Sequence, residues 1–227
     1  MAGRHGMALY SRRAHRWRMF GDVGQERDLQ VLTLVWLPKV VAAVARVASA
    51  TDGAAAHIVI YPRYHLDNAS RLAMYPLASV PSAVDAVGNY LLLACAPLDL
   101  TLLHVQLTGP LSPAAQPRAT LTVARELSIL SVGRPLRDIA LVAPLHGAAA
   151  EPRSCVLLRA GGGLSVLDMA QGSEVVLSQG VECFWLPSAP VWAAPDVRAG
   201  SRSALRVTRT MHIGYGTVVR GSPEWVC

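Results

Sequence analysis

Side chains that could perform chemistry occur along the chain, but their spacing does not match a familiar catalytic motif. Acyl transfer by a nucleophile needs Ser or Cys beside His, with backbone donors for an oxyanion. The chain has four Cys, at positions 95, 155, 183 and 227, and no Gly-x-Ser-x-Gly segment. Cys155 and Cys183 have no activating neighbours in the sequence. A triad assembled from distant residues therefore remains only as an alternative.

Metal, phosphate and acid–base chemistry are equally weakly indicated. A phosphate cradle needs Gly-x-x-x-x-Gly-Lys-Ser/Thr or a strand-anchored Gly-x-Gly-x-x-Gly, and the segment GYGTVVRG at 214–221 has glycines at other intervals. No Cys-x-x-Cys pair occurs. Isolated histidines stand at His57, His65, His104 and His212, and turn carboxylates are expected at Asp67, Asp85 and Asp99. We expect no catalytic, cofactor-binding or metal-binding residue.

The charge pattern favours an anionic partner surface. The formal net charge is +6, and no Asp or Glu occurs before Asp22. An anionic lipid surface, a nucleic acid or an acidic protein partner would all suit this charge. The basic residues are scattered beyond the first 18 positions, and Lys39 is the only lysine, so we expect no nucleic-acid partner.

Apolar periodicity predicts a core built from strands. Apolar segments of strand length are bounded by turn residues at 29–37 and 56–64, and the stretch 87–107 holds two more such runs around a Pro-Leu-Asp turn. Trp17 and Met19 alternate with Arg16 and Arg18, which predicts a half-buried strand paired with the preceding ALYS segment. The stretch after Pro38, VVAAVARV, is predicted as a strand, with a short helix as the alternative. Aromatic residues are expected to pack in the core, with partner contact as the alternative, at Trp17, Phe20, Trp36, Tyr61, Tyr90, Phe184 and Trp185.

Glycines separate three strands in the region from 154 to 185. Gly161-Gly162-Gly163 and Gln171-Gly172-Ser173 lie between apolar runs, and glycine supplies the positive φ that tight turns require. Strand pairs begin near positions 31, 88 and 154. Repeated modules of this kind predict an all-β chain of antiparallel hairpins, as in propeller blades or a β-sandwich.

Several segments, in order, resemble the larger subunit of the Golgi Ric/Rgp guanine-nucleotide exchange complex. The first spans Arg16–Gly21 with Gln25, Glu26 and Trp36, and the second is carried by Leu66–Ala69 within 58–72. NYLLLACAPLDLTLLHV is similar to the family's following strand pair, and RELSILSVGRPLRDIALVAP to the connection behind it. SCVLLRAGGGLSVLDM and Gly180–Trp185 are similar to its hairpin and its Val-Glu-x-Phe-Trp segment.

The resemblance implies an incomplete set of blades from the family's N-terminal WD40-like β-propeller region. We expect residues 1–187 to form the partial propeller and 188–227 to add further strands. The end at PEWVC, which interrupts a strand-like run, leads us to expect a fragment of a longer protein.

The functional implication is a scaffold of an exchange factor for a Rab-type GTPase. The implied partners are the smaller subunit of the complex, the GTPase and, peripherally, the Golgi membrane surface. The implied location is the cytosol and the cytoplasmic face of the Golgi, in retrograde transport from endosomes. No catalytic role for this chain is implied.

Two alternatives are open from the sequence. One is a hydrolase on a β-propeller or β-sandwich with a dispersed triad, which would need a polar pocket holding Ser or Cys, His and an acid. The other is a small β protein imported into an organelle, with Met1–Phe20 removed, since an acid-free basic start is also typical of transit peptides.

Overall fold

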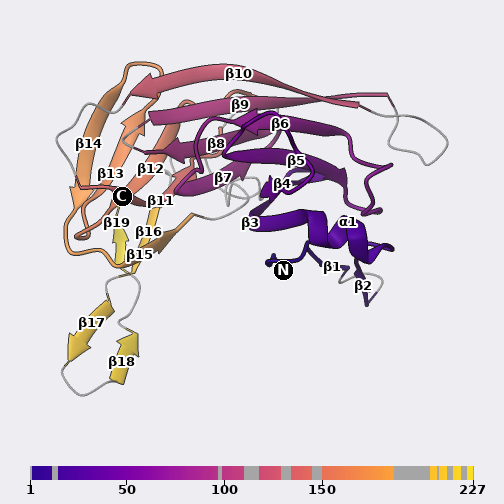
Figure 1. Ribbon diagram of the computed structural model, residues 1–227. Helices are drawn as coiled ribbons and strands as arrows, with labels where there is room; N and C mark the ends of the chain where they lie inside the picture. The colour runs from indigo at the N-terminus through magenta and orange to yellow at the C-terminus, as the bar shows by residue number, and fades with distance from the viewer. Residues whose placement is uncertain are drawn as a thin grey trace, which may run out of the picture.

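The computed structural model is almost entirely antiparallel β-sheet (Figure 1). It describes residues 2–11, 15–96, 99–109, 118–128, 134–144 and 150–186, and the backbone of strands at 205–208, 210–213, 217–220 and 224–226. The predicted all-β fold built from antiparallel hairpins is confirmed.

Three four-stranded antiparallel sheets follow one another along the chain as blades. The first blade contains β3 (Leu29–Trp36), β4 (Val40–Val47), β5 (Ala56–Pro62) and β6 (Ala73–Leu77). The second contains β7 (Ala83–Val87), β8 (Tyr90–Cys95), β9 (Asp99–Thr108) and β10 (Arg118–Ser128). The third contains β11 (Leu136–Leu141), β12 (Ser154–Arg159), β13 (Leu164–Asp168) and β14 (Ser173–Ser178). In each blade the strands lie in chain order.

Further strands lie at both ends of the chain. An N-terminal hairpin pairs β1 (Leu9–Ser11) with β2 (Arg16–Arg18), and the helix α1 (Val23–Asp28) leads from it into β3. Beyond the third blade, β15 (Cys183–Trp185), β16 (Leu205–Thr208) and β19 (Glu224–Val226) form one sheet, and β17 (Thr210–Ile213) pairs with β18 (Thr217–Arg220). Residues 188–227 thus contain strands, but the boundary at 187 lies next to residues outside the described part and stays a prediction.

The middle strands of the blades are buried on both faces, and those of the second blade have another blade packed on either side. Alternate side chains of a strand point to opposite faces. Leu91 and Leu93 of β8 therefore pack against the first blade, and Leu92 packs against the third. This two-sided burial explains why the sequence of β8 is a continuous apolar run rather than an alternating one.

The first strands of the blades lie beside one another. β7 contacts both β3 and β11, so these three strands form the inner side of the array, and β6, β10 and β14 form the outer edges. This radial order, with blades following each other around an inner side, is that of a β-propeller. The structure contains three such complete blades within its described residues.

The face of the first blade that does not pack on the second blade is covered by the N-terminal segment. Met7, Leu9 and Phe20 are all less than 9 % exposed and pack with Val41 and Tyr61 in one apolar cluster. The opposite face of the same blade packs on the second blade. The basic start of the chain is therefore part of the fold.

Several local expectations are confirmed. VVAAVARV is the strand β4, not a helix; the two runs within 87–107 are β8 and β9, and the three strands expected from 154 onward are β12, β13 and β14. Gly161, Gly162 and Gly172 have φ values of 95°, 83° and 68°, as the predicted turns require.

Other local expectations were wrong. The side chains of Trp17 and Met19 are 51 % and 62 % exposed, so this side of the strand is not half-buried in the blade. Asp85 lies within β7 rather than at a turn, and Asp99 begins β9. The segment RELSILSVGRPLRDIALVAP, interpreted as a connection, supplies the end of β10 and all of β11.

Candidate interaction surfaces

Three segments that are separate in the sequence meet beside the first blade. They are the hairpin strand Arg16–Arg18 with Phe20, the helix α1 with Gln25, and the loop Leu66–Ala69. These are the segments that carried the family resemblance at the N-terminal end. The three segments contact one another in the structure, so the residues that carry the resemblance stabilise one common region.

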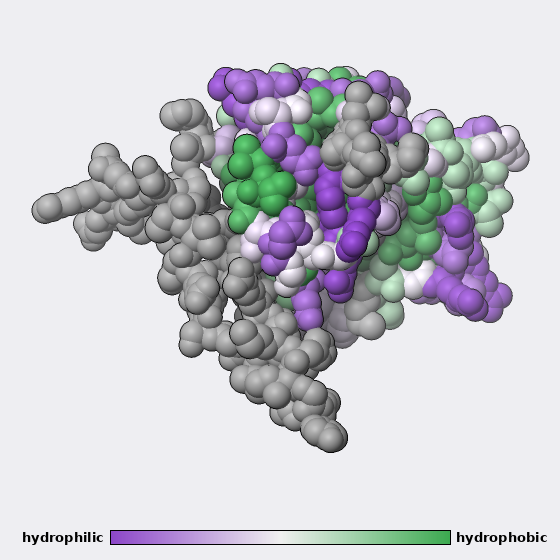
Figure 2. Space-filling model, turned by 90° about the vertical axis from the view of Figure 1, so that its left-hand side faces the viewer, coloured by the Kyte–Doolittle hydropathy of each residue, from purple (hydrophilic) through white to green (hydrophobic). Residues whose placement is uncertain are grey.

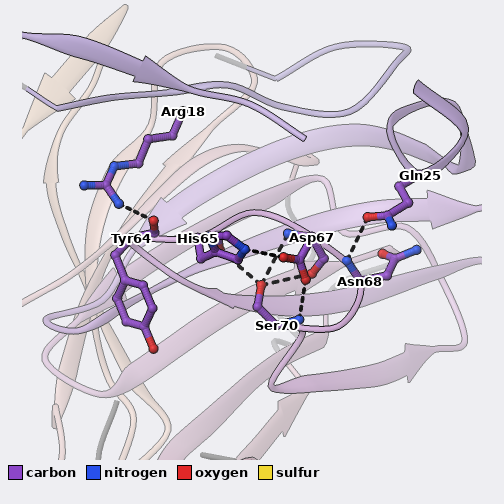
Figure 3. A network of polar contacts seen from close by, with 7 residues as sticks. All are labelled: Arg18, Gln25, Tyr64, His65, Asp67, Asn68 and Ser70. Atoms are coloured by element: carbon purple, nitrogen blue, oxygen red, sulfur yellow. Dashed lines mark hydrogen bonds and ion pairs between the residues drawn. The ribbon is translucent and has the colours of Figure 1, made fainter. Parts of the chain in front are cut away.

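A network of polar contacts fixes the loop after β5 (Figure 3). The Arg18 guanidinium donates to the carbonyl oxygen of Tyr64, and the Asn68 N–H donates to Gln25 Oε1 over 2.9 Å. Within the loop, the Ser70 N–H donates to Asp67 Oδ1 at 2.6 Å, and Asp67 also pairs with His65. The turn role predicted for Asp67 is confirmed. The loop is thus tied to the hairpin at one point and to α1 at another.

Aromatic packing lies directly beneath this network. The rings of Phe20 and Tyr61 meet edge to face, with their centroids 5.7 Å apart. The Tyr61 hydroxyl donates to Asn68 Oδ1 over 3.3 Å, and burial raises the pKa of Tyr61 to about 12. These two residues are core residues, as expected, and Phe184 is also buried at the far end of the third blade.

Two tryptophans on the surface of the first blade have different surroundings. Trp17 packs against Tyr10 across the hairpin, with ring centroids 5.1 Å apart. Trp36 is 50 % exposed, and the Arg63 guanidinium lies 5.0 Å from its ring centroid and donates to the Leu37 carbonyl oxygen. Arg63 therefore partly covers Trp36, whereas Trp17 presents an aromatic pair to solvent.

A groove of about 590 Å³ lies between the first and second blades. Its walls combine apolar side chains such as Tyr75 and Leu103 with the polar residues Asp99, Glu126 and Ser128. The Ser128 hydroxyl donates to Asp99 Oδ1 at 2.6 Å. Cys95 also lines the groove, but no described histidine does, so a Ser or Cys triad is not assembled there.

The outer strand of the third blade carries an exposed apolar stretch. Val175 and Val176 of β14 are each 62 % exposed, and Leu177 is 38 % exposed. Figure 2 views the molecule from the side that carries β14 and shows apolar residues gathered beside polar ones. β14 is also the last strand of its sheet, so its outer backbone edge has no sheet partner among the described strands.

Partly buried polar groups join neighbouring strands. The Asp85 carboxylate on β7 accepts a hydrogen bond of 2.7 Å from the Leu141 N–H on β11. Burial is the main cause that raises the pKa of Asp85. In the third blade Arg159 pairs with Glu174 at 2.8 Å, and the Ser165 hydroxyl donates to the same carboxylate. These groups fix strands and do not surround a cavity.

The histidines and the cysteine considered in the sequence analysis lie in structural surroundings. His57 is buried and its Nε2 lies 2.8 Å from Asp52 Oδ2, and His104 stacks on Tyr90. Burial raises the pKa of Cys155 to about 12, which keeps the thiol protonated and unreactive. Among the described residues no group of three or more His, Cys, Asp or Glu could hold a metal ion. The side chain of His212 lies outside the described residues.

No helix in the described part of the chain is long and apolar enough to cross a membrane.

Comparisons with known structures find propellers of low similarity. Sqt1 of Chaetomium thermophilum bound to the N-terminus of ribosomal protein L10 is 13 % identical, with a TM-score of 0.45 over 78 % of this chain and 42 % of that one. The Cps50 (Swd1) β-propeller domain of Myceliophteria thermophila is 15 % identical, with a TM-score of 0.39 over 92 % of this chain and 50 % of that one. The chain spans less than half of the Sqt1 structure and half of the Swd1 structure.

No curated protein sequence matches the chain. A family model does, and it covers residues 1–214, which includes the N-terminal hairpin, all three blades and β15 to β17. The family is described as the second β-propeller domain of RIC1, which refines the expected N-terminal propeller region to a particular propeller. The chain belongs to the family of RIC1 second β-propeller domains.

Proposed function

We propose that the chain is a partner-binding propeller segment of a guanine-nucleotide exchange complex for a Rab-type GTPase. The observation that carries this proposal is the family match over residues 1–214. It is supported by the convergence of Phe20, Gln25 and Asn68, residues of the family-like segments, on one face of the first blade.

An exchange factor acts by binding the nucleotide-free GTPase more tightly than the nucleotide-bound form. This activity needs complementary surface rather than a nucleophile, a metal or a cofactor. The described residues fit such a role, because they form stacked blades with exposed aromatic and apolar side chains and a groove without a histidine. The net charge of +6 would speed encounter with acidic partner surfaces.

The finer parts of the proposal concern partners and place. The partners are the smaller subunit of the complex, the Rab-type GTPase and, peripherally, the Golgi membrane surface. The complex would act at the cytoplasmic face of the Golgi in retrograde transport from endosomes.

Co-purification with the smaller subunit tests the role in the complex. We expect the chain to retain the smaller subunit when it is expressed within the longer protein, because the binding surface extends over flanking blades, and to bind it weakly alone. Strong binding by this chain alone would overturn the dependence on flanking blades. Two results together would overturn the proposed function: no binding of the smaller subunit in either context, and a nucleotide-exchange rate of the Rab-type GTPase that does not change when the longer protein is added.

The alternatives have less support. Import with removal of Met1–Phe20 would strip Met7, Leu9 and Phe20 from the core of the first blade. A hydrolase would need its triad outside the groove between the blades, where the described residues include no histidine.

A further inference from the structure

The groove between the first and second blades lies at one end of the seam that joins them. Over most of this seam apolar side chains of both blades pack in one cluster, which includes Leu91 and Val105 of the second blade. Near the end of β8 and the start of β9 the same face of the second blade becomes polar, and a space of about 590 Å³ remains between the blades. A space of this size can hold a ligand or a few side chains of a partner.

The strand register shows which side chains of the second blade share the wall of this groove. In the pairing of β10 with β9, Glu126 lies opposite Thr101 and Ser128 lies opposite Asp99 (Figure 1). Residues directly opposite in an antiparallel pair share one face of the sheet, and diagonal neighbours are about 7–8 Å apart. Glu126 and Asp99 are diagonal neighbours, so two carboxylates lie along one wall. One cationic side chain placed between them can contact both.

A β-bulge makes this wall acidic. The register of β10 against β9 shifts between Val123 and Arg125. Beyond the shift Arg125 lies opposite Leu102, whose side chain packs toward the third blade, and Arg125 pairs there with Glu151. Without the extra residue, the alternation of side chains would place Arg125 rather than Glu126 on the groove side. The bulge therefore takes a cation out of the groove and puts a carboxylate in its place.

The two carboxylates have no counter-ion within the described part of the chain. Glu126 and Asp99 are both exposed, and neither forms an ion pair with another described residue. Asp99 accepts a hydrogen bond from the uncharged Ser128 hydroxyl. The described lining contains no Lys, Arg or His. Its apolar part comes from both blades and includes Tyr75, Leu77, Leu93 and Leu103.

We propose that this groove binds an extended, basic segment of a partner protein. An Arg or Lys side chain of the segment lies between Asp99 and Glu126, and a neighbouring apolar side chain packs on the apolar lining. The planar guanidinium of Arg can donate to both carboxylates at once. Charge complementarity of this kind selects a cationic partner segment and opposes an acidic one. The inference adds a binding site to the proposed function and rests on it only in taking the occupant to be a protein.

Fluorescence anisotropy of the full chain with labelled peptides tests the proposal. The probe is Ser-Leu-Ser-Arg-Ser-Leu-Ser, in which Leu and Arg share one face of an extended chain. Matched peptides carry Gln or Glu in place of Arg. We expect the Gln peptide to bind about ten-fold more weakly than the Arg peptide, and the Glu peptide more weakly still. Binding of the Arg peptide should weaken as salt is raised.

Variants of the chain locate the binding site. Glu126→Gln should lower the affinity for the Arg peptide about ten-fold, and Glu126→Lys should make the chain prefer the Glu peptide. The matched control is Glu151→Gln, which removes the same charge between the second and third blades and should bind as the unchanged chain does. Because Glu126 is exposed, its substitution should leave the thermal midpoint nearly unchanged, which circular dichroism measures.

Several outcomes would overturn the proposal. They are no binding of the Arg peptide at millimolar concentration, equal affinities for the three peptides, and equal losses in Glu126→Gln and Glu151→Gln. Self-association of the chain that Glu126→Gln abolishes, without any effect on peptide binding, would assign the groove to a second copy instead. The peptide assay needs neither the smaller subunit nor the GTPase, so its failure is distinguishable from failure of co-purification, which tests the proposed function.

Discussion

At the scale of single residues, the partly buried carboxylate of Asp85 joins two inner strands, and its desolvation makes its negative charge unfavourable. Its acceptor role toward the Leu141 N–H is needed, but its negative charge is not. Burial raises the pKa of Asp85, so ionisation is less favourable in the folded than in the unfolded chain. The group therefore opposes folding above its folded pKa, and this effect disappears as pH falls through that pKa.

Two substitutions at Asp85 separate these effects. Asp85→Asn keeps an oxygen acceptor without the charge, and it should raise the free energy of unfolding at pH 7. Asp85→Ala leaves the Leu141 N–H without its partner and should lower stability by about 1–3 kcal/mol. Urea unfolding at pH 7 and at a pH below the folded pKa measures both. A loss of stability in Asp85→Asn at pH 7 would contradict this account.

Turn glycines offer a second test at residue scale. Gly162 and Gly172 both have positive φ, but a Cβ on Gly162 would lie 2.8 Å from the Val181 backbone nitrogen, whereas a Cβ on Gly172 would meet nothing within 4 Å. Gly172→Ala should therefore cost about 1 kcal/mol from backbone strain alone. Gly162→Ala should cost clearly more, because backbone has to move. Equal midpoints in thermal unfolding of the two variants would show that the close approach is relieved without cost.

At the scale of elements, the N-terminal segment acts as a cover for the first blade. Phe20→Ala should destabilise the chain by about 3–5 kcal/mol, because the ring is buried against Tyr61. Trp17→Ala, three residues earlier but on the outward face, should change stability by less than about 0.5 kcal/mol. Denaturant unfolding monitored by circular dichroism compares them. Similar values would mean that the segment does not pack as the structure shows.

The exposed outer strand β14 predicts a solubility effect. Val175 and Val176 lie on an edge strand, β14, whose only charged residue is Glu174. Glu174 already pairs with Arg159. Exposed apolar edges promote association between sheets. Val176→Lys should reduce concentration-dependent aggregation measured by light scattering while leaving the thermal midpoint nearly unchanged. Val156→Lys, in the buried β12, is the control and should unfold the chain.

The sequence predicted the middle strands of the blades better than their margins. β4, β5, β8 and β12 are buried on both faces over most of their length, so their apolar runs are continuous and bounded by turns. β6 contains Pro76, β7 contains Asp85, and β10 alternates exposed and half-buried residues, so composition did not mark them as strands. The exposed side of the hairpin was misread for a related reason: alternation reveals two faces but not which one is buried.

The interaction surfaces were less predictable. The family-like segments could be found in the sequence, but not that Arg18 reaches Tyr64 or that Gln25 reaches Asn68, 43 positions away. Such contacts depend on the path of the loop after β5, which no local pattern encodes.

At the scale of the whole molecule, two buried clusters link the three blades in series, and the thiols report on separation of the blades. Cys155 is fully buried in the cluster between the second and third blades, whereas Cys183 is exposed. A thiol reagent should modify Cys183 quickly in the native chain and Cys155 only at the rate of blade separation or global unfolding. Mass spectrometry of peptides after timed labelling measures both rates. Rapid labelling of Cys155 under native conditions would show that the blades separate readily.

The covered face of the first blade also gives the stack a direction. Each blade has two faces. The face of the first blade that points away from the second blade is already occupied by Met7, Leu9 and Phe20. Another blade that packed on this face would have to displace the N-terminal segment. Closing a ring on that side would therefore replace the contact with the segment by a contact with a blade. The hairpin that is carried outward on this segment would then shift with it, which would make its position an indicator of whether the ring is open or closed.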